Sequence, residues 1–391
     1  MKVVARTGNE AMAEAMRQIN PDVVAAYPIT PATEVVQLFA SFVADGLVTT
    51  EFVPAESEHS ALSACVGASS AGARVMTSTS SQGLALMHEI LYIAGGMRLP
   101  IVICLVNRAL SSPINIHCDH SDSLGSRDSG WLQIFAENTQ EAYDTTIIAV
   151  KAAEEARLPA MVTTDGFIIS HSMERVEMLD DKDVPIFLGE RKTLNSVLDL
   201  DKPLSFGSLD LQDYYFEHKR SQIEAMNTCL PIIEKAHKAF ADKFGRYYPI
   251  VDEYKMDDAE VAILCLGSTA GTAKVTVEKM RAQGKKVGVI RPRVYRPFPK
   301  DQLLKALAKV KAVAILDRAE TMSGQGGHLF NEVKAILYDA KSRPLIKDYV
   351  YGLGGRDISI EELESIYNEM LDFQKAGKVD KDLAYFGVRG E

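Results

Sequence analysis

Short apolar runs alternate with longer segments of helical pattern along the first half of the chain. Four runs lack the polar alternation of a half-exposed strand, namely residues 23–27, 75–79, 101–106 and 160–164. Such runs are typical of parallel strands that are covered on both faces. The segments between them, such as residues 58–72 and 82–95, are rich in small residues and favour helices. This order predicts an α/β fold in which the carboxyl ends of parallel strands, and any site, lie along one edge of the sheet.

The alternation stops at about residue 178 and returns in the last third of the chain. Irregular sequence reaches residue 215, and a helical pattern covers residues 216–244. Further strand candidates then alternate with helices, at residues 261–266, 287–290, 293–299 and 312–316. A charged C-terminal helix leads into a tail that we expect to be loose. The pattern predicts a larger domain with its connecting segment over residues 1–250 and a smaller α/β domain over residues 251–391.

Length and charge limit the classes of function. A chain of 391 residues is long enough for two hydrophobic cores. Its formal net charge of −10 argues against nucleic acid or an anionic membrane as a partner, because both require a positively charged face. Neither a signal peptide nor a run of ~20 apolar residues is recognisable. We therefore expect a cytoplasmic protein.

The cysteines are spread along the chain and form no C-x-x-C pair of the kind that introduces many zinc and iron–sulfur sites. They are Cys65, Cys104, Cys118, Cys229 and Cys265. Most have apolar or small neighbours, which favours buried, reduced thiols in a cytosolic protein. We expect this chain to hold no metal and no cluster.

A proline-bounded turn follows the first apolar run. In Tyr27-Pro-Ile-Thr30-Pro, the two prolines fix the backbone and present the Thr30 hydroxyl at the carboxyl end of a strand. An ordinary turn with Thr33 as the helix N-cap explains the same residues equally well.

Two carboxylates, Glu56 and Glu58, and His59 stand at the start of a helix of small residues. Acids are favourable at any helix N-terminus, so a structural role is the simpler alternative. The small residues of 61–72 permit close packing, however, and a buried carboxylate needs a partner or a proton. The hydroxyl-rich turn of residues 77–84 either caps a helix or lines the same edge of the sheet. It lacks the spacing of a P-loop, so we do not interpret it as a phosphate-binding loop.

Arg108 directly follows an apolar run, so its guanidinium is expected at the sheet edge, where it suits a substrate carboxylate. An internal salt bridge is the alternative. The following loop contains His117, Asp119, His120 and Asp122, which invite a metal site. We interpret them as loop scaffolding, because the loop is tight and no further scaffolded ligand pair accompanies them.

Asp165-Gly166, with Asn195 downstream, loosely imitates the Gly-Asp-Gly…Asn-Asn motif by which thiamine enzymes hold magnesium and diphosphate. Thr164 replaces its first glycine and Ser196 its last asparagine. Because no other segment supplies that motif, metal and diphosphate would have to be held elsewhere.

Taken together, a set of motifs in fixed order resembles the α subunits of pyruvate:ferredoxin oxidoreductases, within the 2-oxoacid:ferredoxin oxidoreductase family. The motifs are Tyr27-Pro-Ile-Thr30-Pro, Glu56-Ser-Glu58-His59, Ser80-Ser-Gln-Gly-Leu84, Asn107-Arg108-Ala-Leu, Pro113-Ile-Asn-Ile, Asp119-His120-Ser-Asp122, Tyr295-Arg296-Pro-Phe298 and Tyr351-Gly-Leu-Gly-Gly355-Arg356-Asp. The resemblance covers essentially the whole chain. It implies a pyrimidine-binding thiamine diphosphate domain followed by a transketolase-C-terminal-like domain.

The resemblance also implies a function and a set of partners. The family oxidises pyruvate reversibly to acetyl-CoA and carbon dioxide and reduces ferredoxin. Thiamine diphosphate is shared with a β subunit that carries the magnesium and diphosphate motif. Subunits of the γ and δ type carry the coenzyme A domain and 4Fe–4S clusters, and the whole is expected as a dimer of heteromers. The chain alone would be catalytically incomplete.

Roles for individual residues follow from the matching motifs. The resemblance implies that Glu58 hydrogen-bonds the cofactor's pyrimidine ring, that Thr30 and Arg108 hold the substrate carboxylate, and that Pro28 lies beside the thiazolium. His117-Cys118 departs from the tryptophan and asparagine of many relatives, which puts local loop contacts in doubt.

Thr30 after Tyr-Pro-Ile favours pyruvate, since oxalate-using relatives carry arginine there. The 2-oxoisovalerate and 2-oxoglutarate enzymes stay open as alternatives. So do two others: a self-sufficient transketolase-like enzyme, which the missing diphosphate motif disfavours, and a non-catalytic structural subunit, which intact Thr30, Glu58 and Arg108 disfavour.

Overall fold

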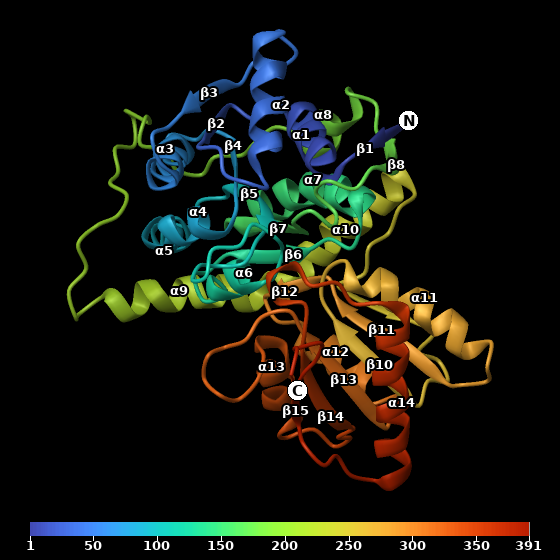
Figure 1. Cartoon of the computed structure of the whole chain (residues 1–391). Helices are drawn as coiled ribbons and strands as arrows, with labels where there is room; N and C mark the ends of the chain where they lie inside the picture. Colours follow the sequence, from blue (N-terminus) through green and yellow to red (C-terminus); the bar gives the residue numbers. More distant parts are fainter. Residues whose placement is uncertain (391) are drawn as a thin grey trace.

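The computed structural model describes residues 1–390, which form a larger and a smaller lobe (Figure 1). The larger lobe is built on a seven-stranded sheet of order β12-β6-β7-β5-β4-β2-β3, and the smaller lobe on a six-stranded sheet of order β15-β14-β13-β10-β11-β9. Every neighbouring pair is parallel except β12 with β6 and β9 with β11. Strands β1 and β8 pair with each other in a separate antiparallel ribbon. The chain is therefore an α/β protein, as the alternation predicts.

The strands, in chain order, are β1 (Lys2–Arg6), β2 (Val23–Ala26), β3 (Glu51–Pro54), β4 (Val75–Thr79), β5 (Val102–Asn107), β6 (Leu132–Phe135), β7 (Ala160–Asp165), β8 (Glu174–Met178), β9 (Val251–Tyr254), β10 (Val261–Cys265), β11 (Val287–Pro292), β12 (Val294–Arg296), β13 (Ala312–Asp317), β14 (Leu345–Val350) and β15 (Leu383–Tyr385).

The helices are α1 (Gly8–Ile19), α2 (Thr33–Ala44), α3 (Glu58–Ser70), α4 (Ser81–Leu86), α5 (His88–Gly96), α6 (Ser121–Gly125), α7 (Thr139–Ala156), α8 (Asp183–Leu188), α9 (Tyr215–Thr228), α10 (Leu230–Phe244), α11 (Thr269–Arg281), α12 (Lys300–Leu307), α13 (His328–Leu337) and α14 (Ile360–Ala376), with a short 3₁₀ turn at Leu353–Gly355.

The central strands of the larger sheet are apolar throughout because both of their faces are covered. Along β5, Val102, Cys104 and Val106 belong to the core that contains α1 and α7. The alternate residues Ile103 and Leu105 belong to the core on the opposite face, which contains α3 and α5. Two cores therefore sandwich one sheet, which explains the unbroken apolar runs.

Seven strand candidates are confirmed to within two residues, and the candidate over residues 293–299 contains the shorter β12. No candidate from the sequence corresponds to the other strands, which are β1, β3, β6, β8, β9, β14 and β15. The expected helix over residues 216–244 is two helices, α9 and α10, with Pro231 in the first turn of α10. The tail expected to be loose contains β15, which pairs in parallel with β14. That part of the expectation was wrong, because three residues of strand give no detectable period.

Strand β12 crosses from one lobe to the other. It follows β11 of the smaller sheet after a single residue but pairs antiparallel with β6, joining Val294 to Ile134 and Arg296 to Gln133. A segment that the alternation assigned to the second domain thus completes the first sheet, and the division at residue 250 stays a prediction.

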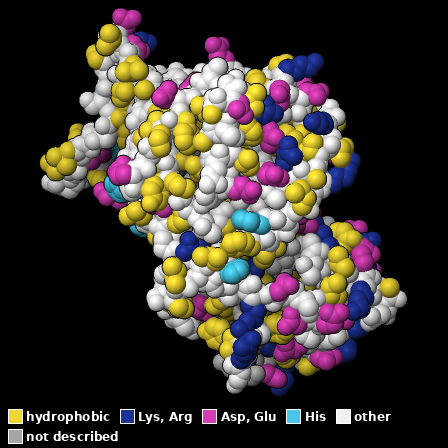
Figure 2. All heavy atoms as spheres, turned by 45° about the horizontal axis from the view of Figure 1, so that its top comes forward, with side chains coloured by type: hydrophobic (Ala, Val, Ile, Leu, Met, Phe, Trp, Pro, Cys, Tyr) yellow, Lys and Arg dark blue, Asp and Glu magenta, His cyan; other side chains and the backbone are white. Residues whose placement is uncertain are grey.

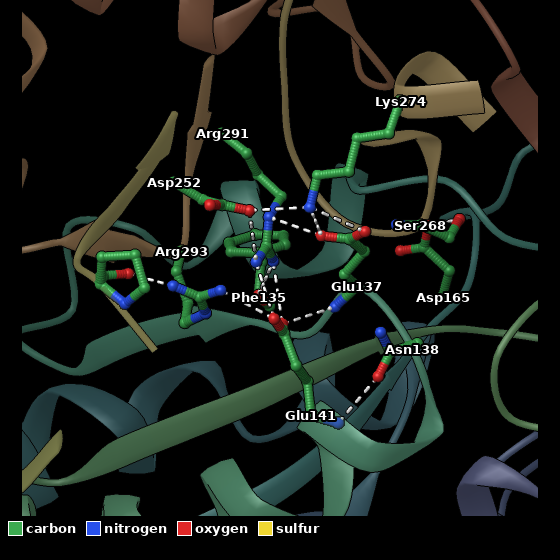
Figure 3. Close-up of polar contacts among 11 residues, drawn as sticks. Phe135, Glu137, Asn138, Glu141, Asp165, Asp252, Ser268, Lys274, Arg291 and Arg293 are labelled. Atoms are coloured by element: carbon green, nitrogen blue, oxygen red, sulfur yellow. Dashed lines mark hydrogen bonds and ion pairs between the residues drawn. The ribbon is translucent and has the colours of Figure 1, made fainter. Parts of the chain in front are cut away.

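A network of buried and partly buried charges also joins the lobes (Figure 3). Glu141 on α7 accepts two hydrogen bonds from Arg291 and one from Arg293, both near the end of β11. Lys274 bridges Glu137 and Asp252. Burial alone would raise the pKa of Glu141, but the two arginines outweigh it and hold that pKa well below its usual range.

The connection between α8 and α9 is irregular, as expected, and runs along the outside of the larger lobe before α9 (Figure 1). All five cysteines are buried and carry free thiols, which confirms their expected burial. In the space-filling view, hydrophobic side chains gather in groups on the larger lobe, whereas charged side chains are frequent on the smaller one (Figure 2). Among residues 1–390, no helix has both the length and the apolarity needed to span a membrane.

Candidate active site

The strand order creates a crevice at one edge of the larger sheet. From β2 the chain moves to β3 on one side, and it then returns past β2 to add β4, β5 and β7 on the other. The loops after β2 and β4 therefore leave the sheet in opposite directions. Such a reversal is where ligands bind in open α/β sheets, outside the carboxyl ends of the strands.

Thr30 and Arg108 meet at this edge. Nη1 of Arg108 donates to the Thr30 carbonyl at 2.9 Å, and Nε donates to the Asn115 carbonyl at 2.8 Å. Asn9 of α1 fixes the same turn by donating to the Pro31 carbonyl at 2.8 Å. The Thr30 side chain is exposed, and Thr33 does not cap α2, so the ordinary-turn alternative lacks its expected cap.

The salt-bridge alternative for Arg108 is not observed within residues 1–390, where its guanidinium contacts carbonyl oxygens and no carboxylate. The side chain is largely buried, and this burial lowers the pKa of Arg108, although nearby Asp122 opposes the shift. A partly desolvated guanidinium with no carboxylate partner is suited to bind an external anion. Its Nη2 forms no hydrogen bond in the described chain.

Asp122 organises the backbone on which Arg108 sits. Its Oδ2 accepts from the backbone nitrogens of Arg108 and Ser81, at 2.9 and 3.0 Å. Its Oδ1 accepts from Asn107 and Ser123. Burial raises the pKa of Asp122 to about 6, against the opposing effect of these donors. One buried carboxyl group thus joins the turn after β4 to the end of β5.

The hydroxyl-rich turn after β4 fastens that strand to β5 and does not cap α4. Ser78 and Ser80 donate to the Cys104 and Val106 carbonyls, at 2.9 and 2.6 Å. Ser81 has a φ of +45°, unusual for a residue with a Cβ, and is held there by Asp122 and by a bond to the Ala109 carbonyl.

Glu58 lies in the first turn of α3 and is 7% exposed. Its carboxyl group makes no hydrogen bond within residues 1–390, although burial of a carboxyl group normally demands a partner. Gly83 provides the space beside it. A Cβ at residue 83 would lie 2.7 Å from Glu58 Oε1 and 2.4 Å from Thr79 Oγ1, closer than carbon atoms approach oxygen. Thr79 Oγ1 is also buried without a partner in the described chain.

Glu56 lies two residues before Glu58 and differs from it in both exposure and hydrogen bonding. Its side chain is exposed and accepts a hydrogen bond from the Ser60 hydroxyl, which lowers the pKa of Glu56. The helix itself is capped by Ser57, which accepts from the Ser60 backbone nitrogen. Glu56 is therefore a surface acid with a structural contact, and Glu58 is the buried member of the pair.

The loop after Arg108 docks on the smaller lobe. Asn115 donates to the Gly354 carbonyl at 2.9 Å, and the Gly354 nitrogen donates to Asp119 at 3.3 Å. The ring of His117 contacts that of Phe167 in a tilted arrangement, with ring centroids 4.9 Å apart. These contacts agree with the interpretation of the loop as scaffolding, and they bring the Gly-Leu-Gly-Gly segment near residue 354 to the same edge.

Asp165 lies between the lobes. Its Oδ1 is 2.8 Å from Nε2 of His120, and its Oδ2 accepts from Ser268 and from Nη1 of Arg318. Figure 3 shows Ser268 of the smaller lobe beside it. Burial would raise the pKa of Asp165, but His120 and Arg318 more than reverse this and lower it. The carboxylate is thus occupied by neighbours within its own chain.

Three potential metal ligands meet in this region. Ligand atoms of Cys118, His120 and Asp165 lie within 4.8 Å of one another. Burial, followed by the charge of Asp165, raises the pKa of Cys118, whereas metal ligation requires a thiolate. The nearby guanidinium of Arg318 would also repel a cation. The cluster is better explained as a lobe-to-lobe contact.

Gly83 was given no role from the sequence, and Asp122 was expected only as loop scaffolding. Gly83 is important because a side chain at this position would displace Glu58 and Thr79. Asp122 is important because it accepts hydrogen bonds from four donors. The signals were present but weak: a glycine inside a helix start, and an acid in a loop otherwise expected to be scaffolding. Pro28 and Thr30 are exposed, and the Thr30 carbonyl contacts Arg108 at the sheet edge, while the Glu58 carboxyl group lies next to Gly83.

Comparisons with known proteins match nearly the whole chain. The family profile "Pyruvate flavodoxin/ferredoxin oxidoreductase, thiamine diP-bdg" matches residues 14–238, and "Pyruvate:ferredoxin oxidoreductase core domain II" matches residues 259–363. Pyruvate synthase subunit PorA of Thermotoga maritima is 53% identical, over 99% of this chain and 98% of the relative. Ketoisovalerate oxidoreductase subunit VorA of Pyrococcus abyssi is 43% identical, over 99% of this chain and 98% of that relative.

Solved structures of other enzymes share the fold. The 2-oxoglutarate:ferredoxin oxidoreductase of Magnetococcus marinus superimposes with a TM-score of 0.73 at 21% identity, covering 95% of this chain and 65% of that one. A split-gene transketolase superimposes with a TM-score of 0.55 at 12% identity, covering 94% of this chain and 99% of the transketolase chain. The chain therefore spans about two thirds of the first of these neighbours.

Proposed function

The chain belongs to the pyruvate:ferredoxin oxidoreductase family, and we propose that it is the α-type subunit of an enzyme that converts pyruvate and coenzyme A reversibly to acetyl-CoA and carbon dioxide while reducing ferredoxin. The single observation that carries the proposal is the buried carboxyl group of Glu58, which has no partner within residues 1–390.

Thiamine diphosphate fits the residues at this edge. Its pyrimidine ring offers nitrogen atoms to a carboxyl group, and the unpartnered Glu58, with the space left by Gly83, is suited to meet them. Pro28 and Thr30 are exposed at the neighbouring turn, beside the expected thiazolium. When bound, thiamine diphosphate supplies the carbon nucleophile that attacks the 2-oxo carbon and accepts the electrons released with carbon dioxide.

Each residue of this chain has a distinct task in the proposal. Glu58 holds a proton at a pyrimidine nitrogen and allows it to move, which is a role that only an acid can fill. Arg108 binds the substrate carboxylate through the part of its guanidinium that its own chain leaves unpaired. Thr30 orients Arg108 through its carbonyl and offers its exposed hydroxyl to the substrate.

The magnesium ion, the diphosphate contacts and the 4Fe–4S clusters are proposed to reside in partner subunits of the β, γ and δ types. Asp165, the closest match to a diphosphate motif, is bonded to His120, Ser268 and Arg318, which supports a site elsewhere. Exposed apolar side chains at the same edge, Ile114 at 78% and Ile116 at 42%, support a covering partner. Five buried free thiols support a reducing, cytoplasmic compartment.

Pyruvate is the proposed substrate because the pyruvate synthase subunit of Thermotoga maritima is more similar to this chain than the ketoisovalerate relative of Pyrococcus abyssi, by 53% to 43%. The second candidate substrate is 2-oxoisovalerate, which is supported by the 43% identity to the ketoisovalerate relative over nearly the full length of the chain. The ratio of kcat/KM for the two 2-oxoacids decides between them, and a preference for the branched acid would exclude pyruvate as the main substrate.

Glu58→Gln in the assembled complex tests the proposal. Glutamine is nearly isosteric and retains a hydrogen bond, but it delivers no proton, so the rate is expected to fall by roughly 10² or more with the cofactor still bound. Exchange of the thiazolium C2 proton, followed by quenched-flow NMR, should slow in parallel. Glu56→Gln is the matched control and should retain most activity.

Two outcomes contradict the proposal. Unchanged exchange in Glu58→Gln together with slowed exchange in Glu56→Gln means that the other carboxylate acts on the cofactor. Micromolar binding of thiamine diphosphate and magnesium by the isolated chain, measured by calorimetry, means that the site is not shared with a partner.

A further inference from the structure

Three arginines stand at the edge of the larger sheet opposite the candidate active site. Arg74, Arg98 and Arg157 shortly precede β4, β5 and β7, which are consecutive neighbours in the sheet. Because these strands are parallel, their amino ends, and the arginines before them, lie along one edge. The concentration of positive charge is unexpected in a chain of net charge −10.

A pocket of about 250 Å³ opens at this edge. Arg98 and Arg157 line it from the sheet, and Arg191 and Lys192 line it from the irregular connection after α8. Glu154 is the acid among its lining residues, and Arg74 already binds that carboxylate with two hydrogen bonds, of 2.7 and 3.0 Å. The cations that face the pocket therefore exceed the negative charge available to them.

None of these four cations forms an ion pair with a carboxylate in the described chain, although ion pairs are frequent elsewhere in it. Arg98 donates to the carbonyls of Ala156 and Arg157 at the end of α7. Arg191 donates weakly, at 3.4 Å, to Ser69. Its Nη1 is buried and has no hydrogen-bond partner within residues 1–390.

This arrangement carries a free-energy cost unless an anion enters the pocket. Burial, and then repulsion from Arg157, lowers the pKa of Arg98. Burial also lowers the pKa of Arg191, although the nearby carboxylates of Glu154 and Asp22 oppose this shift. A buried guanidinium nitrogen without an acceptor loses its hydration without compensation. Guanidinium groups match the oxygens of a phosphate in pairs, which makes phosphate the favoured occupant.

We propose that this pocket is a binding site for a small phosphate-bearing ligand. The pocket lies slightly below the roughly 300 Å³ at which drug-sized ligand pockets begin, so it suits a phosphate group with a small attached molecule. A pocket of this size, lined by a residue with a buried and unpaired guanidinium nitrogen, favours a small anion over an acidic protein segment, which would require a broader face.

The proposed site is separate from the candidate active site and does not depend on the proposed function. The six residues of β5 lie between Arg98 and Arg108 and span roughly 20 Å. A ligand held at the amino edge therefore cannot contact Thr30, Glu58 or Arg108, and its binding is measurable without turnover.

Inorganic phosphate is the probe. The assembled complex, saturated with thiamine diphosphate and magnesium, is dialysed against radiolabelled phosphate at constant ionic strength. We expect saturable binding of one phosphate per chain. Arg191→Gln and Arg98→Gln should each weaken it at least about tenfold, since a charge-assisted contact is lost. Lys202→Gln, an equal change of charge at an exposed residue of the same connection, should leave it unchanged.

Thermal unfolding and size-exclusion chromatography of each variant accompany the dialysis, and Arg98→Gln serves as the second variant if Arg191→Gln does not assemble. Absence of saturable binding in the unmodified complex overturns the proposal, as does equal weakening by Lys202→Gln. Release of a subunit by Arg191→Gln, with no phosphate bound to the unmodified complex, shows that the pocket is a protein contact and also overturns it.

Discussion

Replacement of Arg108 by alanine gives the sharpest test of how this edge of the sheet recognises its substrate. The change removes the proposed carboxylate contact and also the hydrogen bonds to the carbonyls of Thr30 and Asn115. Each hydrogen bond to a charged group contributes about 1.5 to 3 kcal/mol. Loss of the substrate contact alone therefore raises KM for the 2-oxoacid about 10- to 150-fold.

Two further variants separate the substrate contact from the structural ones. Thr30→Ala removes the hydroxyl but keeps the carbonyl that binds Arg108, so we expect KM to rise only about 2- to 10-fold, as for a neutral hydrogen bond. Arg108→Lys keeps the charge but cannot reach two carbonyls and a carboxylate with one planar group. Its KM should lie between those of the wild type and Arg108→Ala.

The assay follows reduction of ferredoxin by the assembled complex while 2-oxoacid and coenzyme A are varied in turn. Thermal unfolding and subunit composition establish that each variant is intact. If KM for coenzyme A rises in Arg108→Ala while KM for the 2-oxoacid stays at its wild-type value, Arg108 belongs to the other substrate and the reasoning is refuted.

Two more predictions concern packing and buried charge. Gly83→Ala places a Cβ against Glu58 and should weaken thiamine diphosphate binding to the complex by about 1 to 3 kcal/mol in a cofactor titration. Gly67→Ala is the control, because a Cβ at residue 67 meets open space and should leave the affinity unchanged. Equal affinities of the two variants for thiamine diphosphate would contradict the role of Gly83. Glu141→Gln breaks a buried ion pair and should lower the free energy of unfolding in urea at pH 7 by about 3 to 5 kcal/mol, against at most about 1 kcal/mol for the exposed Glu155→Gln. The pKa of Glu141 is lower in the folded protein than in the unfolded chain, so this stabilisation is fully present above the unfolded pKa, near 4.5, and is lost as the pH falls through the folded pKa. The difference in unfolding free energy between the wild type and Glu141→Gln should therefore shrink at low pH. A difference that stays constant as the pH falls would disprove the assignment.

The sequence was informative where local pattern and tertiary structure agree. Strands such as β4, β5 and β7 are covered on both faces, so their unbroken apolar runs identify them. Strand β12 falls within the candidate over residues 293–299, but its pairing with β6 of the other sheet could not be predicted, and the three-residue β15 was not predicted at all. Their positions depend on pairing that only the folded chain provides.

The candidate site shows the same division. The types of Thr30, Glu58 and Arg108 and their places after strands predicted a common edge, because parallel strands end together. The Thr30 contribution to Arg108 is a backbone carbonyl, however, and carbonyls have no sequence signature. The space at Gly83 is likewise a property of three-dimensional packing.

The crossing of β12 also determines the order in which the lobes can mature during synthesis. Strand β6 has no partner on its outer side until residue 296 has left the ribosome, long after the rest of its sheet has been made. A nascent chain halted near residue 250 would present that bare edge, which is a template for association with other chains. Completion of the first sheet must therefore wait until β11 of the second lobe has been synthesised.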